Sequence, residues 1–189
     1  MEKIKEINSK YTILPIENID TDQIIPAVHL KSINRLNFGQ HLFSNWRRDD
    51  KLDVNNWPIS GSKNKILLAG TNFGCGSSRE HAVWALYDYG FRAVLSVKIA
   101  DIFTLNSLNN GLLPIEIDQN TYEYLVNSDL NEAIIIDLEN QFVNIPSIGK
   151  KITFEISPFK KDCLLNGFDT IDYLINAKPE IESYESEKR

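Results

Sequence analysis

A short apolar run that breaks into glycines constrains the fold of this chain most. Residues Ile66-Leu67-Leu68-Ala69 have the length and composition of a buried strand, and the glycine-rich segment Gly70 to Gly76 follows at once. A helical pattern then begins at Ser78 and continues to Tyr89, where Gly90 provides a C-terminal stop. A strand, a glycine turn and a helix in direct succession are typical of an α/β fold.

The glycine turn is suited to holding an anion. Its glycines permit positive φ angles and close backbone approach. Ser77 and Glu80 have the S-x-x-E spacing of a capping box, which predicts a helix start near Ser78. Backbone N–H groups and the helix dipole would converge on Ser77 and Ser78, and Arg79 adds a planar cation matched to a carboxylate or phosphate. An ordinary capped turn is the alternative, but two hydroxyls beside an arginine favour an anion site.

Better-known glycine motifs do not fit the segment. A P-loop requires a lysine after the glycines, and none follows here. A dinucleotide-binding fingerprint requires a third glycine at the position of Arg79. A nucleophile elbow requires Gly-x-Ser-x-Gly, which the segment lacks.

Strand and helix patterns alternate along the chain. The predicted strands are 11–16, 65–69, 93–97, 112–117, 133–138, 141–145 and 152–156, and the predicted helices are 78–89, 101–109, 121–127 and 170–177. Residues 46–63 have mixed charge and a proline, which predicts a surface excursion, and the charged tail 178–189 predicts either a frayed end or a surface helix. Because no repeat or low-complexity linker divides the chain, we expect one α/β domain over residues 1–189.

Composition argues against several classes of protein. A net charge of −6 does not supply the basic face on which nucleic-acid binding depends, so we expect no nucleic-acid partner. No apolar run approaches the roughly 20 residues that span a bilayer, and the first residues lack the apolar core of a signal peptide. We therefore expect a cytoplasmic protein without a membrane segment.

The candidate metal ligands are few and scattered. Cys75 and Cys163 are the only cysteines, so neither a disulfide framework nor a C-x-x-C site is indicated, and an iron–sulfur cluster needs three or four thiolates. Asp20 and Asp22 have no further carboxylate nearby, which favours a turn with side-chain-to-backbone hydrogen bonds over a divalent cation. We expect no metal in this chain. For Cys75, we favour a small residue that fits a tight turn over a reactive thiol at a helix N-terminus.

Several separated motifs resemble one family, in the same order. The segment from Phe73 to Ala82 is similar to the signature of the swivelling domain of the aconitase superfamily, and together with Asn72 and Trp84-Ala85-Leu86 it resembles the small subunits of bacterial 3-isopropylmalate dehydratases. The likeness continues in residues 18–26, 38–43, 100–103, 106–114 and 163–169. The resemblance implies a swivelling β/β/α domain, with a central mixed sheet or barrel-like core flanked by helices.

The resemblance also implies an activity. These enzymes interconvert 2-isopropylmalate and 3-isopropylmalate through 2-isopropylmaleate, by dehydration and rehydration, in leucine biosynthesis. Ser77 would be the catalytic base, Ser78 and Arg79 would bind one substrate carboxylate, and Arg35 would bind the other. The loop that reads the substrate's side chain is expected at Ala27, Val28, His29 and Leu30.

The chemistry of these residues fits the implied roles. A serine is a poor base at its ordinary pKa, so it needs fixed dipoles and cations that stabilise an alkoxide. Departure of the hydroxyl needs a Lewis acid, which a [4Fe–4S] cluster with one uncoordinated iron would provide. The resemblance assigns that cluster to a separate large subunit, and two cysteines require the same division. We therefore expect this chain to be half of an active site, completed by a large-subunit partner.

Two other functions fit the same turn. A related hydro-lyase, such as homoaconitase or a methylmalate or citraconate hydratase, would keep Ser77 and Arg79 but read a different side chain. A non-catalytic carboxylate-binding module would retain only the turn. His29 stands where many relatives have an aromatic residue, and Lys160-Lys161-Asp162 departs from the family pattern, so no anion-binding role is transferred to that segment. The aromatic residues Trp84 and Tyr87 are expected in the core or at a subunit interface.

Overall fold

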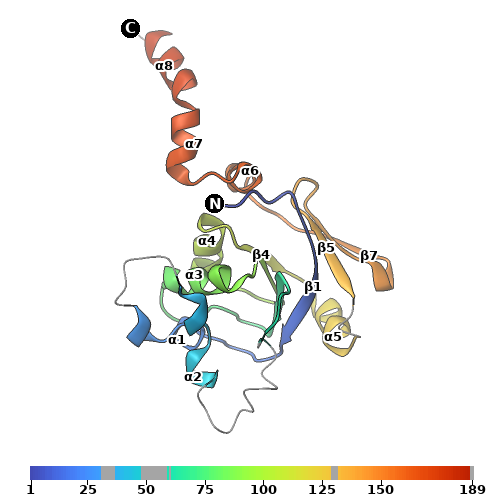
Figure 1. The fold of residues 1–189 in the computed structure, drawn as a ribbon. Coiled ribbons are helices and arrows are strands. Elements are labelled where there is room, and N and C mark those ends of the chain that lie inside the picture. The colour runs from blue at the N-terminus through green and yellow to red at the C-terminus, as the bar shows by residue number, and fades with distance from the viewer. Residues whose placement is uncertain (31–36, 48–58, 60, 129–131, 188–189) are drawn as a thin grey trace.

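Seven strands form one mixed sheet in the computed structural model, which describes residues 1–30, 37–47, 59, 61–128 and 132–187 (Figure 1). The strands are β1 (Glu6–Leu14), β2 (Ile66–Ala69), β3 (Ala93–Ser96), β4 (Leu113–Glu116), β5 (Ala133–Asp137), β6 (Phe142–Ile145) and β7 (Lys150–Thr153). The α-helices are α1 (Thr21–Ile24), α2 (Ser44–Arg47), α3 (Glu80–Tyr89), α4 (Asp101–Asn109), α5 (Gln119–Asn127), α6 (Pro158–Asn166), α7 (Thr170–Asn176) and α8 (Lys178–Glu187). Three short 3₁₀ helices lie at Ala27–His29, Gly39–His41 and Pro146–Ile148.

The sheet has a parallel half and an antiparallel half that meet at β1. Its strand order is β4-β3-β2-β1-β5-β6-β7. Strands β1 to β4 run parallel to one another, whereas β5 pairs antiparallel with β1 and is followed by antiparallel β6 and β7. Helices accompany the parallel half, because each parallel crossover needs a connection long enough to return to the same edge (Figure 1).

Two hydrophobic cores lie on opposite faces of the parallel half. The side chains of β2 point alternately into the two cores. Leu67 and Ala69 pack with α3, whereas Ile66 and Leu68 pack with α5 and the antiparallel strands. All four residues of β2 are buried. A strand covered on both faces is continuously apolar, which is why its pattern is recognisable in the sequence.

Most predicted elements are confirmed to within a few residues. The predicted helix 101–109 matches α4, and the predicted strands 65–69, 93–97, 112–117, 133–138 and 141–145 overlap β2 to β6. The first strand is longer at its N-terminal end than predicted, and the last lies at 150–153 instead of 152–156. Helices α1, α2 and α6 were not predicted. The charged tail forms a surface helix, α8, and not the frayed end that was the alternative prediction.

Most of the predicted surface excursion, residues 46–63, lies outside the described residues. Within the described part, Trp46 and Arg47 belong to α2. Ile59 is buried, and its carbonyl oxygen accepts a hydrogen bond from the Tyr89 hydroxyl. Both ends of the excursion are therefore attached to the body of the protein. None of the described helices is both long enough and apolar enough to cross a membrane.

Candidate active site

The predicted site lies at the carboxyl edge of the parallel strands. Strands β1, β2 and β3 end at Leu14, Ala69 and Ser96, and the segments that follow them are joined by backbone hydrogen bonds. Because parallel strands end at one edge, their loops meet there, and this edge is where open α/β sheets bind ligands. The turn after β2 is the central one of the three, since β2 lies between β1 and β3.

The glycine turn is held by close backbone approach on both sides. A Cβ atom on Gly70 would lie 2.3 Å from the carbonyl oxygen of Ile16. A Cβ atom on Gly74, where φ is +74°, would lie 2.3 Å from the ring of Phe103. The Gly74 N–H donates to the carbonyl of Ile19 at 2.8 Å. These contacts require glycine at both positions and fix the path of the chain toward the serines.

The predicted capping box at Ser77 and Glu80 is wrong. Helix α3 begins at Glu80, its N-cap residue is Arg79, and no side chain caps it by a hydrogen bond. The Glu80 carboxylate instead accepts a hydrogen bond from the Asn110 side chain at 2.8 Å. The sequence has the S-x-x-E spacing of a capping box, but the Glu80 side chain hydrogen-bonds to Asn110 in a distant segment and not to the backbone at the start of its own helix. The N-terminal end of α3 is therefore left without a side-chain cap and adjoins the serines.

Ser77 is exposed at the mouth of the turn and is held by α1. The Thr21 hydroxyl donates to the Ser77 carbonyl at 2.9 Å, and the two hydroxyl oxygens of Thr21 and Ser77 lie 3.2 Å apart. Either hydroxyl can be the donor in the second contact. Ser78 is also exposed. Both serine side chains are thus accessible from solvent at the end of the turn.

Arg79 is tied to the same short helix. Its guanidinium forms a salt bridge with Asp22 of α1 and lies 3.4 Å from the Ile25 carbonyl. The hydrogen bond from Arg79 lowers the pKa of the Asp22 carboxyl. The same carboxylate oxygen of Asp22 accepts the Ala27 N–H at 3.2 Å. One side chain of α1 therefore connects the arginine with the start of the loop at Ala27.

The loop predicted to read the substrate's side chain is a 3₁₀ turn beside the site. Ala27 and Val28 point into solvent, with Val28 69% exposed, whereas His29 and Leu30 are half-buried. The imidazole of His29 stacks on that of His41, with ring centroids 3.9 Å apart, and its Nε2 lies 3.2 Å from the Ser44 hydroxyl oxygen. The loop therefore presents two small apolar side chains and is anchored by its histidine.

The structure brings together most of the predicted site residues through α1. Ser77, Arg79 and the loop Ala27–Leu30 each contact this helix or follow it in the chain. Arg35 lies outside the described residues. Sequence reasoning missed Thr21 as a partner of Ser77. The Asp-x-x-Gln spacing could have revealed helix α1, because Asp20 and Gln23 form a capping box there.

The residues of this chain do not fit a [4Fe–4S] cluster. Cys75 lies in the turn with its sulfur 3.6 Å from the Asn18 carbonyl, whereas Cys163 is buried in α6. Among the described residues, no group of three or more histidine, cysteine or acidic side chains is arranged to hold a metal ion. Burial and the Asp20 carboxylate raise the pKa of the Cys75 thiol. That shift disfavours the reactive-thiol alternative for Cys75.

Comparison with known proteins identifies the family. The family model for the aconitase C-terminal domain matches residues 1–120. The 3-isopropylmalate dehydratase small subunit of Christiangramia forsetii is 48% identical over 100% of this chain and 95% of its own length. The chain belongs to the family of 3-isopropylmalate dehydratase small subunits. The predicted resemblance is thereby confirmed.

Further members of the 3-isopropylmalate dehydratase family agree in sequence and fold. The small subunit of Cytophaga hutchinsonii is 46% identical over 98% of this chain and 95% of its own length. The crystal structure of 3-isopropylmalate dehydratase from Methanocaldococcus jannaschii matches with a TM-score of 0.69 and 28% identity, over 95% of this chain and 99% of that chain. The predicted fold, a mixed sheet flanked by helices as in the aconitase swivelling domain, is confirmed.

Proposed function

We propose that this chain, a 3-isopropylmalate dehydratase small subunit, supplies half of the active site of that enzyme. In this proposal residues 1–189 act as one swivelling domain, and the partner is a large subunit. The observation that carries the proposal is the convergence on α1 of an exposed serine, an arginine and a loop with a small apolar surface. A substrate with a carboxylate next to an isopropyl group needs these three features side by side.

Ser77 is proposed as the base. Isomerisation moves a hydroxyl between adjacent carbons, so a proton must leave one carbon and be returned to the other. An exposed serine oxygen can reach such a proton, and an alkoxide there would be stabilised by the N-terminal end of α3 and the guanidinium of Arg79. Thr21 can support that alkoxide by donating its hydroxyl hydrogen to the side-chain oxygen of Ser77, which lies 3.2 Å away.

The substrate would be held by charge at its carboxylates and by shape at its side chain. Ser78 and Arg79 are proposed to bind one carboxylate, because a guanidinium and a hydroxyl can donate to both of its oxygens. Arg35 is proposed for the second carboxylate. Ala27, Val28, His29 and Leu30 are proposed to face the isopropyl group, which the exposed apolar side chain of Val28 would cover.

The Lewis acid that helps the hydroxyl to leave is proposed to reside on the large subunit, as a [4Fe–4S] cluster. The two cysteines of this chain, one of them buried in α6, support that division. The names of the relatives favour isopropylmalate over the substrates of homoaconitase or of methylmalate and citraconate hydratases, and over a non-catalytic module. Two free cysteines are consistent with a reducing cytoplasmic location, which we also propose.

The proposal is tested by reconstitution. The purified chain is mixed with a cluster-bearing large subunit, and formation of isopropylmaleate from isopropylmalate is followed by ultraviolet absorbance. We expect turnover in the mixture and none with this chain alone, and Ser77→Ala should reduce kcat by about 10³-fold or more because the base is lost. Absence of turnover in the mixture would contradict the assigned activity. Near wild-type turnover by Ser77→Ala would contradict the role of Ser77.

A further inference from the structure

Helices α7 and α8 form an arm, residues 170–187, that projects from the body of the protein (Figure 1). Its base is fixed in two ways. Asp169 caps α7 by accepting the Asp172 N–H at 2.8 Å, and the Phe159 ring of α6 meets the Tyr173 ring edge-on, with centroids 4.7 Å apart. Beyond this base every residue of α8 is exposed. The arm leaves the body on the side away from α1 and α2 in Figure 1.

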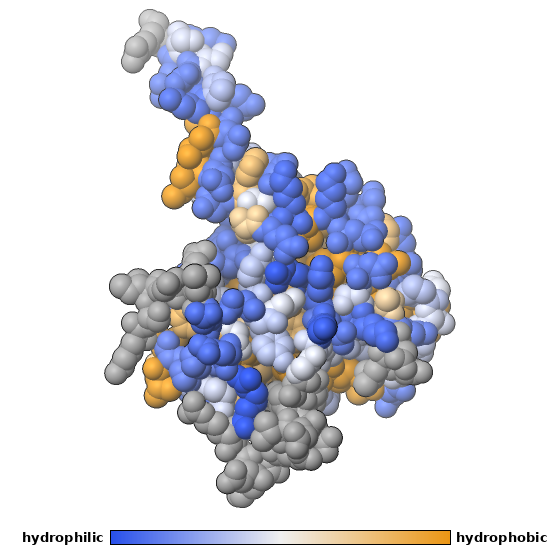
Figure 2. All heavy atoms as spheres, in the orientation of Figure 1, coloured by the Kyte–Doolittle hydropathy of each residue, from blue (hydrophilic) through white to orange (hydrophobic). Residues whose placement is uncertain are grey.

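The arm carries apolar side chains that the rest of the chain does not cover. In α7, Ile171, Leu174 and Ile175 are 67%, 55% and 63% exposed, and their i, i+3, i+4 spacing places them on one face. Ile181 and Tyr184 continue the exposed apolar set in α8. Figure 2 shows an apolar patch on the arm, next to hydrophilic residues. Helices this short are marginal alone in water, so covering the apolar face would stabilise the arm.

The arm lies within the part of the chain that is shared with a relative. The similarity to the Christiangramia forsetii small subunit covers 100% of this chain, and therefore includes residues 170–187. A segment shared over that length with a protein named as a small subunit is more simply explained by a role in the complex than by a loose tail. Exposed apolar clusters of this kind mark sites of protein interaction.

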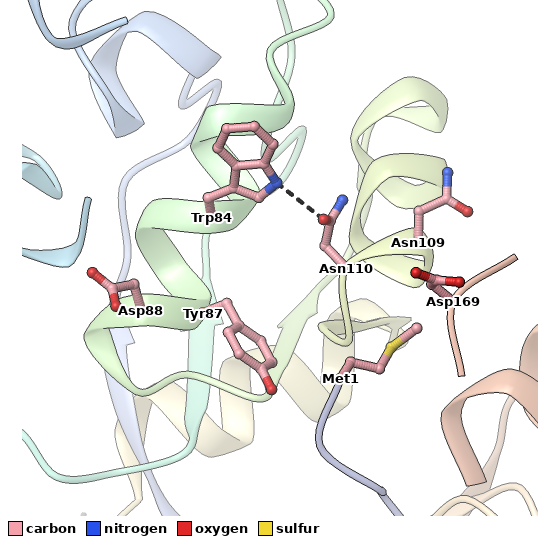
Figure 3. Close-up of a pocket in the computed structure, with 7 residues that line it drawn as sticks. All are labelled: Met1, Trp84, Tyr87, Asp88, Asn109, Asn110 and Asp169. Atoms are coloured by element: carbon pink, nitrogen blue, oxygen red, sulfur yellow. Dashed lines mark hydrogen bonds between the residues drawn. The ribbon is translucent and has the colours of Figure 1, made fainter. Parts of the chain in front are cut away.

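Charge indicates what kind of surface covers the arm. Residues 170–187 contain five acidic residues and one lysine. A hollow of about 290 Å³ opens at the base of the arm, lined among others by Asp88 and Asp169 and by the aromatic rings of Trp84 and Tyr87 (Figure 3). A surface this acidic suits a partner surface that carries lysine or arginine side chains. A second copy of this chain would bring an equally acidic arm, and like charges oppose that pairing.

We infer that the arm, together with the hollow at its base, is a docking surface for the large subunit. The matching face of the large subunit is an apolar groove bordered by lysine or arginine side chains. The inference rests on the proposed function, because it requires a large subunit that assembles with this chain. Because the arm and α1 lie on different sides of the body, docking through the arm would be a second contact with the large subunit, separate from the one that brings the cluster to Ser77.

The test compares two double variants of the full chain that add the same charge. Leu174→Glu with Ile175→Glu alters the apolar face, whereas Asn176→Glu with Ser183→Glu alters exposed polar positions of the same arm. Affinity for the cluster-bearing large subunit is measured by calorimetry at low and high salt, and turnover is measured on the same complexes. We expect the first variant to bind at least about tenfold more weakly than the second, as for hot-spot residues, and wild-type affinity to fall as salt rises.

The possible outcomes distinguish failure of the proposed docking surface from failure of the proposed activity. Equal affinities for the two variants, with normal turnover of the wild-type complex, would overturn the docking surface alone. Weaker binding by the apolar-face variant, with no turnover of isopropylmalate by any complex, would support the docking surface and overturn the proposed activity. A third outcome is a wild-type chain that sediments alone as a dimer, with an apolar-face variant that is monomeric but binds the large subunit as tightly as the wild type. That result would show a second copy of this chain as the occupant of the apolar face and would overturn the inference. Thermal unfolding checks that both variants are folded.

Discussion

The hydroxyl oxygen of Thr21 lies 2.9 Å from the Ser77 carbonyl oxygen and 3.2 Å from the Ser77 hydroxyl oxygen, although the two residues are 56 positions apart in the chain. Thr21 is 2% exposed, so its hydroxyl depends on these contacts for hydrogen bonding. The threonine thus fixes the backbone of the proposed base and also contacts its side chain.

Replacing Thr21 by valine removes this hydroxyl and keeps the shape of the side chain. We expect kcat in the reconstituted enzyme to fall by about tenfold, or about 1.4 kcal/mol, because the alkoxide loses a donor. Stability should fall by about 1 kcal/mol from the lost buried hydrogen bond. Thr21→Ser, which keeps the hydroxyl, is the control and should restore most of kcat. Equal kcat values for the valine and serine variants would show that the hydroxyl has no catalytic part.

Asp22 is expected to position Arg79 and the loop at Ala27. Asp22→Asn keeps the size of the side chain but removes the charge that holds the guanidinium. Since exposed ion pairs contribute up to about 1 kcal/mol, KM for isopropylmalate should rise by about fivefold or less, while kcat changes little. Steady-state kinetics of the complex provide the measurement. A loss confined to kcat would place Asp22 in the chemical step and not in positioning.

The sequence was sufficient for elements whose pattern is local. Strand β2 is buried on both faces and reads as an unbroken apolar run, and α3 ends at Gly90, whose N–H donates to the Leu86 and Tyr87 carbonyls. Helix α6 also has a local signal in the sequence, because Ser157 caps it and Pro158 occupies its first turn. The N-terminal part of β1 escaped prediction because Ile7 is the only apolar residue between Glu6 and Lys10, and the consecutive polar residues Asn8, Ser9 and Lys10 break the alternation typical of a strand.

The contacts of the candidate site could not be predicted, because they join distant segments. Arg79 and Asp22 are 57 positions apart, and no local pattern in either segment encodes their pairing. The capping box failed for the same reason, since Glu80 finds its partner in Asn110, 30 positions away. Motif resemblance identified Ser77 and Arg79 as site residues, whereas only the fold reveals that α1 joins them.

Gly74 should tolerate no side chain. Alanine there would combine a positive φ angle with a Cβ atom 2.3 Å from the Phe103 ring, so we expect Gly74→Ala to destabilise the protein by about 2–4 kcal/mol. Gly149 is the matched control: its φ is +59°, but nothing lies within 4 Å of its Cβ position. Gly149→Ala should therefore destabilise the protein by only about 1 kcal/mol, because of the positive φ angle alone. Urea unfolding measures both, and equal losses would show that the contact with Phe103 adds nothing.

Asp118 should make part of the stability dependent on pH. Its carboxylate accepts hydrogen bonds from the Thr121 hydroxyl at 2.6 Å, from Lys150 Nζ at 2.9 Å and from the Thr121 N–H at 2.9 Å. These bonds, with that of the Thr121 hydroxyl the largest, hold the pKa of Asp118 well below its usual range. A carboxyl whose pKa is lowered by folding stabilises the folded state above its unfolded pKa of about 3.9, and this contribution is lost as pH falls toward the folded value.

Asp118→Asn tests this contribution, because asparagine can still cap α5 but cannot pair with Lys150. We expect the wild type to have the higher Tm at pH 7, and the difference between the two proteins to shrink as pH falls below about 4. The effect should be modest, since the Asp118 and Lys150 side chains are 48% and 39% exposed. Circular dichroism melts from neutral to acidic pH measure both proteins, with high salt as a control that weakens the ion pair. A difference in Tm that stays constant down to pH values well below 4 would contradict the assignment of a lowered pKa to Asp118.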